Sequence, residues 1–157
     1  MVSANSRPNP TEHLKLLEKW GRISGYQITF NKEPSLESLK GILNIVNVVS
    51  EYRTNEGARQ SFATIASEMP SGFVLTSVPV VGDETLGFKV SQSTSGVSVS
   101  GYAISFRYKN TIASVAAVGL SGSVNLDDAV ALANAQVRRI AQLSRSANPP
   151  SPTRRRQ

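Results

Sequence analysis

Residues 102–119 read YAISFRYKNTIASVAAVG and carry the most sustained strand pattern in the chain. The large side chains at the start of this stretch fall at every second position: Tyr102, Ile104, Phe106 and Tyr108. A period of two places alternate side chains on one face of a sheet. Lys109-Asn110 interrupts the pattern, and Asn tolerates the left-handed backbone that a tight turn needs. The stretch therefore predicts a β-hairpin.

The second strand of this hairpin is small and apolar on both faces, since residues 111–118 read TIASVAAV. A strand of this kind is typical of the centre of a sheet that is covered on both sides. We interpret the hairpin as the middle of the core. Any function that touches it is expected at its ends, in the turn 107–110 and in the neighbouring loop 82–84.

Helical patterns lie on both sides of the hairpin. Thr11 is expected to cap a short helix, and Thr54 or Asn55 a second one that extends to Met69 and ends before Pro70. After the hairpin, Asn125 and Asp128 resemble a capping box that begins a third helix. The apolar stripe of this third helix comprises Leu126, Ala129, Val130, Ala133, Val137 and Ile140. These helices are amphipathic, so we expect each of them to cover a sheet.

Further strands are expected at residues 23–30, 42–52, 73–78 and 85–91, with a flexible connection over residues 92–96. The order α-β-β-α-β-β-β-β-α with short turns predicts an α+β domain. Its mainly antiparallel sheet has about six strands and is covered by amphipathic helices. We divide the chain into a flexible N-terminus (1–10), one domain (11–143) and a disordered basic tail rich in Pro, Ser and Arg (144–157).

The net charge of +6 is confined to one end of the 157-residue chain. Residues 1–137 hold eleven basic and eleven acidic residues. From Arg138 onward, arginines are the only charged residues. The basic positions of this end are Arg138, Arg139, Arg145, Arg154, Arg155 and Arg156. They form a candidate contact for phosphates or an anionic surface, although three arginines in a tail give weak, salt-screened binding. The simpler interpretation of the tail is a solubilising end.

The sequence contains none of the common catalytic motifs. The chain has no Cys, and its one histidine, His13, has no paired ligand nearby in the sequence. Asp83-Glu84 is the acidic pair beside a glycine turn, but adjacent strand positions point to opposite faces, so the pair suits neither a shared metal nor a shared proton. The sequence thus indicates no catalytic residues, no metal site and no cofactor. We expect a non-enzymatic protein.

No apolar run approaches the roughly 20 residues of a membrane span. The first ten residues, MVSANSRPNP, lack the apolar stretch of a signal peptide.

The hairpin end supplies the remaining candidates for an interaction surface: Arg107, Lys109, Asn110, Asp83 and Glu84.

Several short motifs resemble the PsbP-like α/β/α sandwich domains of small bacterial extracytoplasmic and lipoprotein-type proteins. The residues that carry the resemblance are 20–26 (WGRISGY), 51–53 (EYR) leading to 57–58 (GA), 80–84 (VVGDE), 106–110 (FRYKN) and 131–140. The resemblance implies a non-enzymatic domain, often exported, that binds or stabilises another component. It brings no catalytic residues.

Three hypotheses for function follow. The first is an accessory or interaction domain whose partner is another protein. The second is a weak binder of nucleic acid or an anionic surface through the arginine-rich end. The third is a small-molecule pocket between sheet and helix, near Tyr26, Tyr52 or Tyr102. The oligomeric state stays open.

Overall fold

The computed structural model describes residues 9–33, 40–94 and 96–147. The predicted hairpin is present at its centre as β5 (Val97–Tyr108) and β6 (Thr111–Leu120), joined by a two-residue turn. The left-handed residue of the turn is Lys109, with φ of 54°, and not Asn110 as expected. The Asn110 side chain instead donates a hydrogen bond of 2.7 Å to the main-chain oxygen of Tyr52, which ties the turn to the adjacent strand.

Within the described residues the strands form one open antiparallel sheet in the order β1-β2-β6-β5-β4-β3. The remaining strands are β1 (Arg22–Asn31), β2 (Ile42–Tyr52), β3 (Phe73–Thr76) and β4 (Glu84–Thr94). The sheet confirms the predicted α+β class. β6 lies between β2 and β5, so the prediction of a central strand is confirmed as well.

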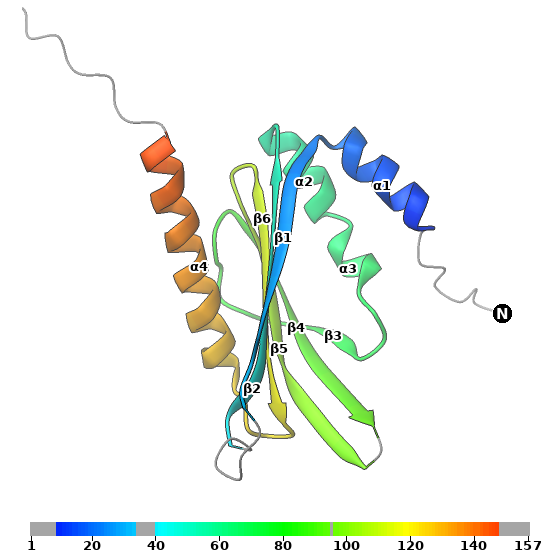
Figure 1. Ribbon diagram of the computed structural model, residues 1–157, viewed down its shortest axis with the longest axis vertical. Helices are drawn as coiled ribbons and strands as arrows, with labels where there is room; N and C mark the ends of the chain where they lie inside the picture. The colour runs from blue at the N-terminus through cyan, green and yellow to red at the C-terminus, as the bar shows by residue number, and fades with distance from the viewer. Residues whose placement is uncertain (1–8, 34–39, 95, 148–157) are drawn as a thin grey trace, which may run out of the picture.

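The helices lie on both faces of the sheet, which Figure 1 shows nearly edge-on with β1 in front. One face carries α4 (Leu126–Ala147), and the other carries α2 (Asn55–Phe62) and α3 (Ile65–Glu68), while α1 (Pro10–Lys19) lies beside the start of β1. None of these helices, within the part of the chain that the structure describes, has the length and apolarity needed to cross a membrane.

Two apolar layers result from the alternation along β5 and β6. On the α4 side, Ile104 and Phe106 are fully buried and pack with Ala129 and Ala133 of the helix. On the α2 side, Tyr52 and Ile112 pack with Phe62. The Tyr52 hydroxyl lies 2.7 Å from the Ser61 hydroxyl and is almost fully buried, so this tyrosine belongs to the core.

The second predicted helix is in fact two. Residues Ala63 and Thr64 form a turn between α2 and α3. The Thr64 hydroxyl donates to the main-chain oxygen of Ser61 (2.9 Å), and the Thr64 amide bonds the same carbonyl, which replaces the regular helical pattern. The apolar side chains after the turn still face the sheet, because Ile65 and Met69 pack on it. Thr54 is the N-cap and accepts a hydrogen bond from the amide of Gly57.

Several predicted boundaries are corrected. The cap of α1 is Asn9 and not Thr11. β3 ends at Thr76, two residues earlier than expected, and residues 92–94 extend β4 by pairing with Val97–Val99 rather than forming a flexible connection. The capping box of α4 is confirmed by reciprocal hydrogen bonds between Asn125 and Asp128. α4 continues to Ala147, so its end lies four residues beyond Leu143.

Candidate functional sites

The residues predicted at the hairpin end come together around Arg107. Its guanidinium pairs with Glu84 through Nε and with Asp83 through Nη1, the latter at 3.1 Å. The Lys109 amide also donates to Asp83, at 2.7 Å. The Arg107 side chain is only 13% exposed, so these contacts are partly shielded from water. The cluster closes the loop before β4 onto the central hairpin.

One expectation about this cluster is wrong. Asp83 and Glu84 do not diverge, because Asp83 lies before β4 in the turn at Gly82 (φ 72°), where strand alternation does not apply. Both carboxylates therefore reach the same guanidinium. Lys109 lies over the ring of Tyr108, and Asn110 bonds Tyr52. Each predicted residue of this end thus has a partner within the protein, which is the arrangement of a structural clasp.

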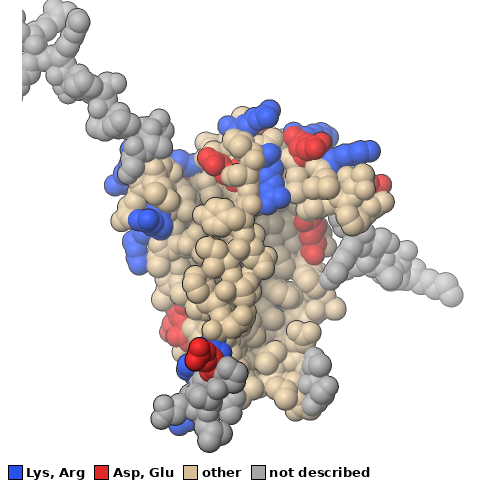
Figure 2. Space-filling model, in the orientation of Figure 1, with Lys and Arg blue, Asp and Glu red and all other residues tan. Residues whose placement is uncertain are grey.

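The basic residues of α4 are placed differently. Arg138, Arg139 and Arg145 are all exposed on its C-terminal half, where no acidic residue occurs. Figure 2 shows Lys and Arg side chains over this half of the helix. The other predicted arginines, Arg154, Arg155 and Arg156, lie outside the described residues.

A third region, β1, has the largest exposed apolar side chains on a sheet face. Tyr26, Ile28 and Phe30 point to the α4 side of the sheet, since Tyr26 pairs with Val49 and Ile28 with Asn47. Their exposed fractions are 60%, 45% and 58%. The cause is coverage: a helix is about 10 Å wide, whereas neighbouring strands are about 4.8 Å apart, so one helix covers about two strands. α4 packs on β5 and β6 and leaves β1 open.

β1 is also an edge strand without the usual protection. Long edge strands are commonly guarded by charges, prolines or a bulge, because their free amides and carbonyls pair readily with another chain. From Ile23 to Asn31 this strand has no charged residue and no proline, and its irregularity lies at its first residues, between Arg22 and Ser24. In Figure 2, which brings β1 to the front, uncharged side chains cover the middle of the surface.

A groove runs between β1 and the end of α4. Tyr26 and Val49 line it on the sheet side, and Ile140 and Leu143 on the helix side. Its volume is about 270 Å³. Leu143 is 54% exposed there. Tyr26 belongs both to this groove and to the apolar row of β1, and Glu51 adds a carboxylate to the sheet side of the groove.

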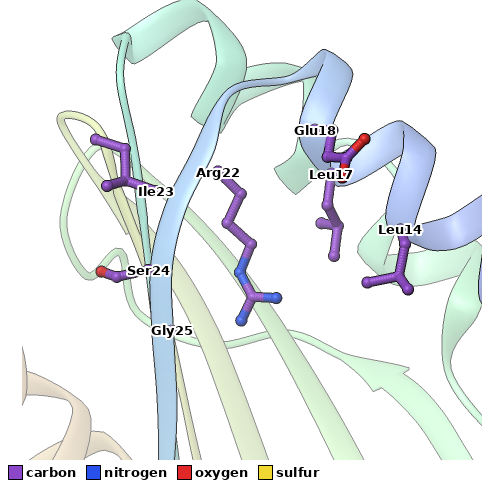
Figure 3. A pocket seen from close by; sticks show the side chains of 7 residues that line it. All are labelled: Leu14, Leu17, Glu18, Arg22, Ile23, Ser24 and Gly25. Carbon is purple, nitrogen blue, oxygen red and sulfur yellow. The ribbon is translucent and has the colours of Figure 1, made fainter.

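The last region is a cavity of about 260 Å³ between α1 and β1 (Figure 3). Leu14 and Leu17 of α1 face the Arg22 side chain, which extends from the beginning of β1. The Arg22 Nε is shielded from solvent, and no hydrogen-bond acceptor for it exists among the described residues. Among the described residues, this arginine therefore lacks the carboxylate partners that Arg107 has.

A metal centre finds no support within residues 9–33, 40–94 and 96–147, where no three His, Asp or Glu residues gather at the spacing that a metal ion requires. His13 lies half-buried on α1. Of the three tyrosines suggested for a pocket, Tyr26 lines the groove between β1 and α4, whereas Tyr102 is half-buried against α4.

The chain matches no protein-family model, no curated protein and no solved structure. The fold and the sites described above therefore define its class, an α+β domain with an open six-stranded antiparallel sheet and helices on both faces.

Sequence reasoning missed β1 and Arg22 as sites. The alternation of Tyr26, Ile28 and Phe30 predicted a strand, but it did not indicate that the apolar face of this strand is exposed. A signal was present: few helices for about six strands means that part of the sheet stays uncovered. For Arg22 the sequence offers no such signal, since the missing partner is a property of the folded chain.

Proposed function

We propose that this domain is a non-enzymatic interaction module that binds another protein by strand addition at β1. The observation that carries the proposal is the combination on β1 of a free ten-residue edge with three exposed apolar side chains, Tyr26, Ile28 and Phe30. An added strand would satisfy the free main-chain groups, and its alternate side chains would pack on the apolar row.

The neighbouring arginines specify the partner further. Arg139 and Arg145 are exposed and neighbour the groove-lining residues Ile140 and Ser144 in the sequence of α4, whose C-terminal half has no acidic residue. Glu51 is the acidic residue that lines the groove, on its sheet side. Complementary charge across an interface favours association and fixes register. The partner is therefore an extended protein segment with apolar residues at alternate positions and acidic residues where it passes α4.

The PsbP-like assignment belongs to the same proposal. The motifs of the resemblance imply a domain that binds another component, and the open β1 edge gives such a component a place to bind. An exported, bacterial accessory protein is consistent with that resemblance. The alternative of a nucleic-acid or anionic-surface binder rests on the α4 arginines alone.

The test selects eight-residue peptides from a random displayed library against the wild-type domain and measures their affinity for two variants. Ile28→Lys places a charge in the middle of the β1 edge. Val74→Lys is the matched control, because Val74 is 66% exposed on the opposite edge strand, β3. We expect selected peptides to alternate apolar and acidic residues and to lose roughly tenfold or more in affinity on Ile28→Lys only, the loss expected for about 1.4 kcal/mol.

Amide hydrogen exchange locates the bound peptide. Strand addition predicts slower exchange of alternate amides of β1 in the complex, because those amides become donors to the added strand. Equal affinity for both variants, or protection that avoids β1, would rule the proposal out. A concentration-dependent dimer that Ile28→Lys abolishes would replace the partner segment with a second copy of the chain.

A salt titration separates the alternative function. An anionic-surface binder predicts affinity for a nucleic-acid duplex that falls steeply with salt. Truncation after Ala147 removes the tail and keeps the whole of α4. The alternative would be favoured if the wild-type domain binds the duplex and the double variant Arg138→Gln/Arg139→Gln does not. It further requires that the wild-type domain binds no peptide at β1.

A further inference from the structure

The Arg22 guanidinium lies in a position that only a glycine at residue 25 allows. A Cβ built on Gly25 would be 1.9 Å from the Arg22 Nη2 and 2.7 Å from its Cζ. Both distances are far shorter than any real contact, so the guanidinium lies directly on the main chain of β1. Gly25 therefore creates the space in which this charge is held, on the α1 side of the sheet.

The charge has no counter-ion there among the residues that the structure describes. Among the described residues, none of the ion pairs involves Arg22, and its shielded Nε–H finds no acceptor. A shielded donor without a partner is unfavourable, because it loses its hydrogen bonds to water and gains none in the protein. Glu18 is at the rim, but its carboxylate points away from the guanidinium in Figure 3. Within the described part of the chain, the positive charge of Arg22 is thus uncompensated at a partly enclosed place.

The opposite wall of the cavity is apolar. Leu14 and Leu17 face it from α1, and Leu14 is 59% exposed although it lies on the apolar side of the helix. No residue of α1 is buried. The side chains of Ile23 and Ser24 point to the other side of the strand, so β1 contributes mainly its main chain. The space between helix and strand is therefore open, with leucines on one side and a guanidinium on the other.

We infer that this cavity binds a carboxylate attached to a short apolar chain, with the carboxylate on the terminal nitrogens of Arg22 and the chain against Leu14 and Leu17. The planar guanidinium matches a carboxylate through two parallel hydrogen bonds. The volume of about 260 Å³ is slightly below the usual range of small-molecule sites, which restricts the ligand to a small acid or to one terminal residue of a peptide.

This site is independent of the function proposed for β1. The guanidinium lies on the α1 side of the sheet, whereas Tyr26, Ile28 and Phe30 point to the α4 side. Loss of either site leaves the other intact, so the two proposals fail separately.

The test titrates the full chain with octanoate and with octanamide, its neutral counterpart, and follows amide chemical shifts of α1 and β1 by NMR. Acetyl-leucine and acetyl-leucinamide form a second pair that represents the terminal residue of a peptide. We expect each acid to bind at least tenfold more tightly than its amide, since charge-assisted hydrogen bonds contribute about 1.5–3 kcal/mol. Tighter binding of octanoate would identify a free acid as the source, and tighter binding of acetyl-leucine a peptide terminus.

Variants assign the effect to the cavity. Arg22→Met should weaken acid binding roughly 10- to 100-fold. Arg22→Lys keeps the charge but not the paired donors, so its affinity for the acid should lie between those of wild type and Arg22→Met. Gly25→Ala should act like Arg22→Met, because the new Cβ displaces the guanidinium. The matched control is Arg53→Met, which removes an exposed arginine that does not line the cavity.

The inference is overturned if octanoate and octanamide bind equally or not at all, or if shifts lie outside α1 and β1. It is also overturned if Arg53→Met weakens binding as much as Arg22→Met. Thermal unfolding of each variant shows whether a lost interaction reflects lost fold.

Discussion

Two arginines of this domain, Arg107 and Arg22, lie in contrasting environments. Arg107 is 13% exposed and contacts Asp83, Glu84 and the Lys109 carbonyl. Arg22 begins the edge strand and has a shielded Nε without an acceptor among the described residues. Arg107, whose donors have acceptors, fastens the loop before β4 to the central hairpin. Arg22 pairs with no carboxylate among the described residues, and we assign ligand binding to it.

The largest effect is expected from Arg107→Met. The variant leaves two carboxylates without their partner and should lower the free energy of unfolding by about 2 kcal/mol. Urea denaturation of variant and wild type measures the difference. Arg107→Lys keeps the charge and should lose less. If Arg107→Met unfolded at the same urea concentration as wild type, the ion pairs of Arg107 would not stabilise the fold.

Arg22→Met should have a much smaller effect on stability. No protein partner is lost, and a shielded donor is removed, so the free energy of unfolding should stay within about 0.5 kcal/mol of wild type or rise. The same denaturation experiment reports it. A loss as large as that of Arg107→Met would mean that Arg22 has a partner in the folded chain, and the contrast between the two arginines would disappear.

The smallest effect is expected at a third arginine, Arg59, which pairs with Glu56 on the exposed side of α2 at 2.8 Å. The hydrogen bond from Arg59 holds the pKa of Glu56 below its usual range. The folded-state pKa is the lower one, so the stabilisation is present above the ordinary pKa of a glutamate and is lost as pH falls through the lowered value. Solvent screens such an exposed pair.

Glu56→Gln should therefore lower the midpoint of thermal unfolding slightly at neutral pH and not at acidic pH. Melting curves of both proteins at several pH values measure this. If the difference in melting temperature between wild type and Glu56→Gln grew as the pH falls, the ionised Glu56 would not be the stabilising partner of Arg59.

Local patterns were sufficient to predict much of the fold. The alternation in β5 and the small apolar residues of β6 predicted a central hairpin, and the capping box fixed the beginning of α4. The break at Thr64 could not be predicted, because its hydroxyl can bond a main-chain oxygen in a continuous helix too.

The sites were harder to predict than the fold. Residue types alone suggested Asp83, Glu84 and Arg107 as an interaction surface, and this stays a prediction. That Arg107 pairs with both carboxylates became visible only in the folded chain. Whether Tyr26 and Phe30 are buried depends on how far α4 extends across the sheet, which no local pattern encodes. Burial is a tertiary property, and so is a missing partner.

The position of β6 has a consequence for the order in which the domain can assemble. β6 is synthesised after the other five described strands, yet it joins β2 on one side to β5 on the other. A nascent chain can form the β1–β2 hairpin early, but this hairpin has no neighbour until Thr111–Leu120 has left the ribosome. The sheet therefore closes late, by insertion of its final strand, and β5, β6 and α4 together form the contiguous segment best suited to start that closure.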